Sequence, residues 1–134
     1  MSCIFCKIIA GEIPSYKVYE DKHTLAFLDI GPVNPGHTLV VPKKHFANIE
    51  EAGEETLCRV MKTVKKVGLS LKKNLGAVGY NILEANDPEA GQSVPHLHFH
   101  LIPRLPGDGL TFWPQKKYAT GEAEAVLKKI NMIK

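Results

Sequence analysis

Three histidines alternate with apolar residues in the run His96-Leu97-His98-Phe99-His100-Leu101-Ile102. Successive side chains of a β-strand point to opposite faces, so a strand over 96–102 would place the three imidazoles on one face and the apolar side chains on the other. A lone histidine is most simply a hydrogen-bonded core or surface residue, but strict alternation of three indicates a site. An imidazole that is largely unprotonated near neutral pH can act as a nucleophile or as a metal ligand.

Of these two uses, nucleophilic attack suits the run better. Two strand histidines two residues apart can share a zinc ion. However, the Cα atoms of His96 and His100 would lie about 13 Å apart at about 3.3 Å per residue, which makes convergence of all three on one ion difficult. His98 alone has an imidazole neighbour on each side, so we expect His98 to be the nucleophile.

The residues just before the histidine run could bind a phosphate, and they read Ala90-Gly91-Gln92-Ser93-Val94. Glycine lets backbone N–H groups approach an anion, and the Ser93 hydroxyl adds another donor. A short Gly-Gln-Ser is a weak signal alone, but it stands three residues before the histidines. We expect these donors to hold a phosphate that His98 attacks, with His37 and His100 stabilising the negative charge of the transition state.

The composition is that of a single soluble domain covering residues 1–134. The chain is 44% hydrophobic and 23% charged, which is ordinary for a globular protein. Its net charge of +3 comes from scattered basic residues, so nucleic acid is not an expected partner. No segment approaches the roughly 20 apolar residues of a membrane span, and the three cysteines do not form a secreted disulfide framework. We therefore predict a cytoplasmic protein.

The pattern of apolar residues predicts an α+β fold with a mainly antiparallel sheet. Apolar residues recur at steps of three and four from Leu57 to Leu75 and are followed by the stop signal Gly76, which is typical of an amphipathic helix. Short β-prone runs are separated by turn residues elsewhere. The expected strands cover 17–20, 24–29, 38–41, 80–84 and 96–102, and the expected helices cover 51–75 and 120–134.

The chain resembles the histidine triad (HIT) family, whose signature of histidines alternating with apolar residues matches His96 to Ile102. Further similar blocks cover Cys3–Ile9, Gly11–Pro14, Leu25–Ile30, Pro35–His45 and Ala90–Val94. The resemblance is greatest to small bacterial-type members related to purine nucleoside phosphoramidases. It implies a five-stranded sheet, a homodimer with a joined sheet, and hydrolysis at the α-phosphate of a nucleoside phosphoramidate through a nucleotidylated His98.

The resemblance also implies which residues form a purine-nucleotide site. The base would lie near five apolar side chains, namely Ile4, Phe5, Ile8, Phe27 and Ile30. Asp29 would accept hydrogen bonds from the ribose hydroxyls. The α-phosphate would be surrounded by His37, Gly91, Gln92, Ser93, Val94, His98 and His100.

Each of these roles has a simpler alternative. The apolar residues would fit a core equally well, and Asp29 would fit a turn before Gly31. The chain also departs from the family at Ala85, where members commonly carry Asn or Gln, and Asn86 beside it is the nearest substitute for that phosphate contact.

Cys3 and Cys6 form a Cys-x-x-Cys pair, which is half of a zinc site, a redox pair, or two small buried residues. The βαβ context of a redox motif is absent. Relatives such as the galactose uridylyltransferases bind structural zinc through this pair and two histidines. The corresponding residues here are His45 and His96, so the resemblance implies a closed Cys₂His₂ site.

Two alternatives to the phosphoramidase interpretation stay open. One is hydrolysis of dinucleoside polyphosphates, and the other is a nucleotide-binding scaffold without turnover.

Overall fold

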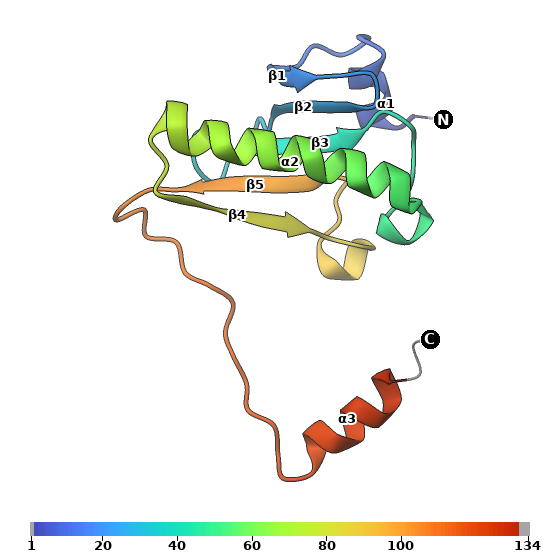
Figure 1. The fold of residues 1–134 in the computed structure, drawn as a ribbon, viewed down its shortest axis with the longest axis vertical. Helices are drawn as coiled ribbons and strands as arrows, with labels where there is room; N and C mark the ends of the chain where they lie inside the picture. The colour runs from blue at the N-terminus through green and yellow to red at the C-terminus, as the bar shows by residue number, and fades with distance from the viewer. Residues whose placement is uncertain (1, 132–134) are drawn as a thin grey trace.

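The computed structural model describes residues 2–131, which form an α+β fold around a five-stranded antiparallel sheet (Figure 1). The strand order is β1-β2-β3-β5-β4. The strands are β1 (Lys17–Glu20), β2 (Thr24–Leu28), β3 (Thr38–Pro42), β4 (Gly79–Glu84) and β5 (Phe99–Arg104). The helices are α1 (Ile4–Ile9), α2 (Glu54–Leu75) and α3 (Glu122–Ile130), with two 3₁₀ turns at η1 (Ile49–Glu51) and η2 (Pro88–Ala90). The predicted fold class is confirmed.

The long helix α2 packs across one face of the sheet, as its sequence pattern predicts. Its buried residues include Val60, Val64, Val67 and Leu71, which are spaced three and four apart and pack on the apolar side chains of the strands. Gly76 ends the helix in the left-handed conformation, with φ of +79°.

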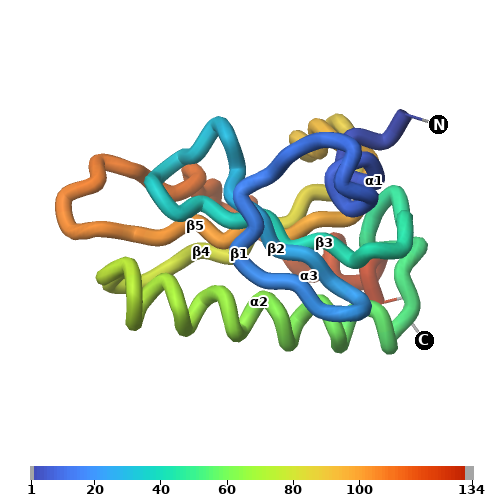
Figure 2. Tube along the Cα trace, turned by 90° about the horizontal axis from the view of Figure 1, so that it is seen from above, coloured from blue at the N-terminus to red at the C-terminus, as the bar shows by residue number. Residues whose placement is uncertain are grey.

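The opposite face of the sheet is covered only in part, by the short helix α1. Figure 2 shows α1 and α2 on opposite sides of the sheet. Phe5 of α1 packs with Leu25 and Phe27 of β2 and with Leu39 and Val41 of β3 in a second apolar cluster. Because α1 has only 6 residues, much of this face stays open for a site.

The strand expected over 96–102 begins only at Phe99, so His96 and His98 lie just outside the ladder. The β3 strand ends at Pro42, and proline has no N–H with which to continue the pairing beyond Val40 and Phe99. The Leu97 N–H instead donates to the Phe46 carbonyl at 2.7 Å. The backbone still alternates, since Leu97 and Phe99 join the cluster beneath α2.

The C-terminal helix α3 lies apart from the sheet, beyond a segment without helix or strand (Figure 1). Of the helix expected over 120–134, residues 132–134 lie outside the described part of the chain. None of the residues that form α3 is buried, and Leu127 and Ile130 of the predicted apolar stripe are exposed. Within residues 2–131, no helix combines the length and apolar character needed to cross a membrane.

Candidate functional site

A cavity of about 250 Å³ opens on the sheet face that carries α1, and His98 and His100 form part of its wall. The structure brings together most of the residues predicted for a nucleotide site. Among the predicted residues, the cavity is lined by Ile4, Phe5, Ile8, Phe27, Asp29, Ile30, Ser93, Val94, His98 and His100. Sequence reasoning missed Ile13, Pro14, Ser15, Leu28 and Leu39, although all of them except Ser15 belong to blocks that resemble the family.

The apolar wall of this cavity serves two purposes. Phe5 and Phe27 are buried and belong to the second apolar cluster, where their ring centroids lie 5.5 Å apart. Ile4 and Ile30 are exposed to solvent at the cavity mouth. The core and the binding-site interpretations of these residues are therefore compatible, because the inner residues support the wall that the outer residues extend.

His98 is held in one tautomer by the chain's own backbone. Its Nδ1 lies 2.7 Å from the His96 carbonyl oxygen, which can only accept, so Nδ1 carries the proton and Nε2 keeps a free lone pair. The side chain is buried, and burial lowers the pKa of His98 from its ordinary value. A neutral imidazole with a fixed lone pair is the form that a nucleophile requires.

His37 and His100 form a hydrogen-bonded chain with a fixed direction. The Val33 N–H donates to His37 Nδ1 at 3.1 Å, so the proton of a neutral His37 is on Nε2. That Nε2–H donates to His100 Nδ1 at 2.9 Å, which leaves the proton of His100 on its own Nε2. Burial, followed by the neighbouring His98 and His37, lowers the pKa of His100 to about 4. His100 is therefore neutral and serves as a donor.

Asp29 takes part in a turn and also faces the histidines. Its Oδ1 accepts from the Gly31 N–H at 2.8 Å, and its Oδ2 lies 3.7 Å from His37 Nε2. Asp29, His37 and His100 place three possible metal donors within 4.8 Å of one another. The proton on His37 Nε2 already bonds His100, so this group fits a hydrogen-bonding network better than a metal site.

Two predicted amide side chains are used within the loop itself. Gln92 accepts from the Asp87 N–H at 2.8 Å and donates to the Ala47 carbonyl at 2.7 Å. Asn86 accepts from the Ile49 N–H at 2.9 Å and donates to Glu84. The structure therefore places Ser93 and Val94 at the cavity, whereas the side chains of Gln92 and Asn86 hold the loop in shape.

A second cavity, of about 260 Å³, shares His100 with the first. Its wall includes Val33, His37, Leu83, Gly91, His100 and Trp113. The chain reaches Trp113 through a fixed turn, because the Arg104 guanidinium donates to both Asp108 oxygens and lies over the Phe112 ring at 5.2 Å. The Arg104 guanidinium also holds the pKa of Asp108 well below its usual range. The sequence after β5 has no periodic pattern of apolar residues that would predict the position of Trp113 in this second cavity.

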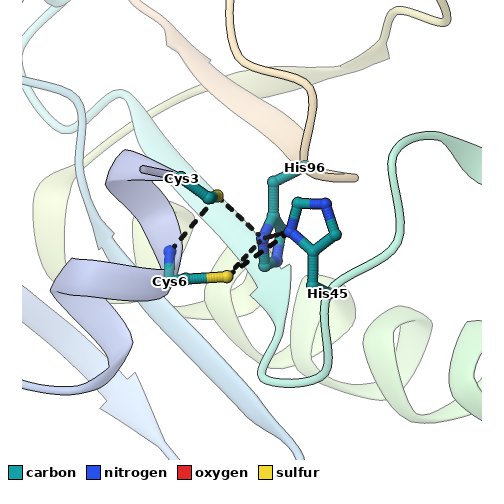
Figure 3. A group of neighbouring side chains, drawn as sticks. All are labelled: Cys3, Cys6, His45 and His96. Carbon is teal, nitrogen blue, oxygen red and sulfur yellow. Dashed lines mark hydrogen bonds between the residues drawn. The ribbon is translucent and has the colours of Figure 1, made fainter. Parts of the chain in front are cut away.

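The four predicted metal ligands meet in one cluster between α1, the segment after β3 and the histidine run (Figure 3). Cys3 Sγ lies 3.5 Å from His96 Nδ1, Cys6 Sγ lies 3.4 Å from His45 Nδ1, and the two Nδ1 atoms are 3.1 Å apart. Tetrahedral zinc with bonds of about 2.0–2.3 Å needs donors about 3.3–3.8 Å apart. The two sulfur–nitrogen distances lie in this range, and the distance between the two Nδ1 atoms lies just below it. His96 Nε2 donates to the Pro42 carbonyl at 2.9 Å, which keeps the Nδ1 lone pair on the cluster.

Comparison with known proteins identifies relatives of this chain in sequence and in fold. A family model described as the HIT domain matches residues 10–107. The adenosine 5′-monophosphoramidase of Schizosaccharomyces pombe is 42% identical over 133 residues, which cover 98% of this chain and 97% of that protein. A HIT family protein from Bacillus subtilis superposes with a TM-score of 0.89 at 42% identity, covering 98% and 96% of the two chains. A zinc-bound histidine triad family protein from Mycobacterium smegmatis superposes with a TM-score of 0.79 at 34% identity, covering 98% and 96%.

The lowered pKa of His100 predicts a specific pH dependence of stability. Because an unfolded histidine has a pKa near 6.5 and the folded His100 near 4, the unfolded chain binds more protons in this window. The free energy of unfolding is expected to fall as the pH drops from 6.5 towards 4. In denaturant titrations at pH 5, 6 and 7, His100→Asn should reduce this slope by up to about 1.4 kcal/mol per pH unit. Equal slopes for the two proteins would contradict the assignment.

Proposed function

The chain belongs to the HIT domain family, and from that premise we propose that it hydrolyses purine nucleoside phosphoramidates through a nucleotidylated His98. The observation that carries the proposal is the backbone bond from His98 Nδ1 to the His96 carbonyl, which frees Nε2 in the wall of the first cavity. The similarity to the adenosine 5′-monophosphoramidase of Schizosaccharomyces pombe supports this substrate class.

The first cavity suits a nucleoside. The apolar side chains at its mouth and wall would contact a flat purine, and Asp29 would accept from the ribose hydroxyls. The α-phosphate would then lie beside Ser93, His98 and His100. A ribose at Asp29 therefore places the phosphorus within reach of the His98 Nε2 lone pair.

The reaction would proceed in two balanced steps. His98 Nε2 attacks the phosphorus, the bond from phosphorus to the leaving nitrogen breaks, and the amine departs with a proton from water. A second water then attacks the phosphorus and gives a proton to the hydroxide left by the first step. Its oxygen stays on the mononucleotide, and the His98–phosphorus bond breaks and returns its electron pair to Nε2. The His96 carbonyl stabilises the positive charge on His98, and the Nε2–H of His100 stabilises the phosphoryl oxygens in both steps.

The second cavity would receive the leaving group. It lies against His100 and has a mainly apolar wall that includes Val33, Leu83 and Trp113. A substrate that spans the two cavities would place its scissile bond beside His100, which lines both.

His98→Ala is expected to lower phosphoramidate turnover by about 10³-fold or more, because the attacking atom is lost. Binding of AMP should persist, since the base and ribose contacts lie elsewhere. His100→Ala should keep the nucleophile and lower turnover by about 10²-fold. Turnover can be followed on adenosine phosphoramidate, and the nucleotidylated peptide containing His98 can be mapped by mass spectrometry without acid.

The outcomes of this experiment separate the proposal from its alternatives. Wild-type turnover in His98→Ala would refute a nucleotidylated His98. Turnover of dinucleoside polyphosphates in preference to phosphoramidates would favour the polyphosphate hydrolase. Binding of AMP without turnover of either class would favour the scaffold.

We further propose that Cys3, Cys6, His45 and His96 hold one structural zinc ion. The donor spacing, the orientation of His96 by the Pro42 carbonyl and the zinc-bound relative from Mycobacterium smegmatis support this site. Zinc would supply a cross-link between the N-terminal segment and the histidine run.

Purified protein is therefore expected to contain about one zinc per chain, measured by elemental analysis. Cys3→Ser should lose the metal and unfold at lower temperature, because one of four ligands is removed. Cys58→Ser is the matched control, since Cys58 is exposed on α2, away from the cluster, and should keep both zinc and stability. Metal-free wild-type protein of undiminished stability would contradict the site.

We also propose that the protein is a homodimer whose sheets join at β4. This strand ends the sheet order and carries the exposed residues Ile82 and Leu83, and α2 beside it exposes Met61 and Leu69. An unpaired strand edge with apolar side chains is a surface that a second copy can cover.

Light scattering at micromolar concentration is expected to give twice the chain mass of 14.8 kDa. Ile82→Lys should shift the protein to monomer, because a charge would be buried in the joined edge. Val18→Lys is the matched control, since Val18 is equally exposed on β1 at the other edge and should stay dimeric. A wild-type monomer would refute the proposed dimer.

A further inference from the structure

We propose that helix α1 couples the Cys/His cluster to the nucleotide cavity, so that metal and nucleotide each strengthen binding of the other. In this arrangement, Phe5 is the positioning residue that connects the two sites. The inference rests on the nucleotide and zinc sites proposed above and adds to them a thermodynamic link.

The first observation is that α1 supplies residues to both sites at once. Cys3 caps the helix by accepting from the Cys6 N–H at 3.4 Å, and both cysteines belong to the cluster. Ile4, Phe5 and Ile8 line the nucleotide cavity from the same 6-residue helix. A shift of α1 therefore moves the cluster and the cavity wall together.

The second observation is that α1 depends on its contacts for its position. Helices shorter than about 12 residues are marginal by themselves in water. Phe5 is the buried residue of α1, and it packs on β2 and β3. Ile8 and Ile9 also pack on the second apolar cluster. Cys6 faces the metal ligands, and Ile4 and Ile8 face the cavity. Ligands at either site therefore supply part of the order that α1 lacks alone.

The third observation is that Phe5 contacts a metal ligand and the nucleophile together. Its ring centroid lies 5.9 Å from that of His96 and 5.0 Å from that of His98, with edge-on geometry at both. The same ring packs edge-on against Phe27 of the cavity wall. Phe5 therefore sets the position of His98 relative to the nucleotide, and the cluster sets the position of Phe5.

Thermodynamic linkage requires that metal and nucleotide change each other's affinity by the same factor. If the metal orders α1 in advance, the nucleotide no longer bears that entropic cost, and the nucleotide strengthens metal binding by the same factor. We expect this factor to be about tenfold, within the usual range for coupled sites of about 5–150.

The test uses zinc-loaded protein and AMP, and its readout is independent of turnover. Zinc transfer to a colorimetric chelator is measured with and without saturating AMP, and AMP affinity is measured by calorimetry before and after zinc removal. AMP should raise the zinc affinity about tenfold, and zinc should raise the AMP affinity equally. Hydrogen exchange of the α1 amides should slow with either ligand.

Two variants separate coupling from loss of a site. Phe5→Leu should bind zinc and should bind AMP more weakly, because Phe5 lines the nucleotide cavity. Its coupling factor, which is a ratio of affinities, should fall close to one, because the ring that joins His96 and His98 is removed. Asp29→Asn should weaken AMP binding and leave zinc transfer in the absence of AMP unchanged, since Asp29 has no contact with the cluster.

The outcomes distinguish the coupling from the functions on which it rests. Failure of zinc or AMP to bind wild-type protein would refute the proposed sites and the coupling with them. Binding of both ligands with unchanged affinities, or an undiminished factor in Phe5→Leu, would overturn the coupling alone.

Discussion

The whole site depends on how His96 is held. Its Nε2–H is bonded to the carbonyl of Pro42, its Nδ1 faces the two cysteines, and its own carbonyl accepts the proton of His98 Nδ1. His96 therefore points its own Nδ1 at the proposed metal site, fixes the tautomer of His98 and leads the backbone into β5. Pro42 makes this possible, because it ends the ladder and leaves a carbonyl that the imidazole can reach.

The two faces of the sheet are packed to different degrees, and this difference creates the cavities. The 22-residue helix α2 seals one face with a regular stripe of valines and leucines. The other face has α1 with the segment that follows it, the loops that follow β2 and β4, and Trp113 from the segment after β5. Side chains that would be core residues in a fully covered sheet instead form the wall of a cavity. Phe5 and Phe27 do both, because they pack in the second apolar cluster and also line the first cavity.

The sequence predicted the elements whose periodicity is strong and the residues whose chemistry is unusual. The course of α2 from Leu57 to Leu75, the positions of β1 to β4 and the common face of the histidines follow from apolar spacing and turn residues. The helix begins at Glu54 rather than at residue 51, and the order of the strands in the sheet was not predicted. The family resemblance added the grouping of Cys3 and Cys6 with His45 and His96. The start of β5 was wrong by three residues, because strand periodicity continues into extended backbone that has no partner strand.

Other parts of the site were beyond sequence reasoning because they depend on contacts between distant segments. Gln92 and Asn86 have the residue types of phosphate ligands, but the loop backbone uses their amides. Val33 acts through its backbone N–H, which leaves no signal in residue type. Trp113 reaches the second cavity from the segment after β5, in which Arg104 binds Asp108.

The hydrogen-bonded series from Val33 through His37 to His100 cannot relay protons. It ends at a backbone amide, which neither gives up nor gains a proton at ordinary pH. If His100 released its Nε2 proton into the cavity and took a proton from His37, His37 would become an imidazolate. The Val33 amide could not supply a proton to restore it. The network can polarise a bound anion but cannot conduct protons to it. Every proton that a reaction consumes at this site must therefore arrive through the mouth of a cavity, which makes water entry a part of the chemistry.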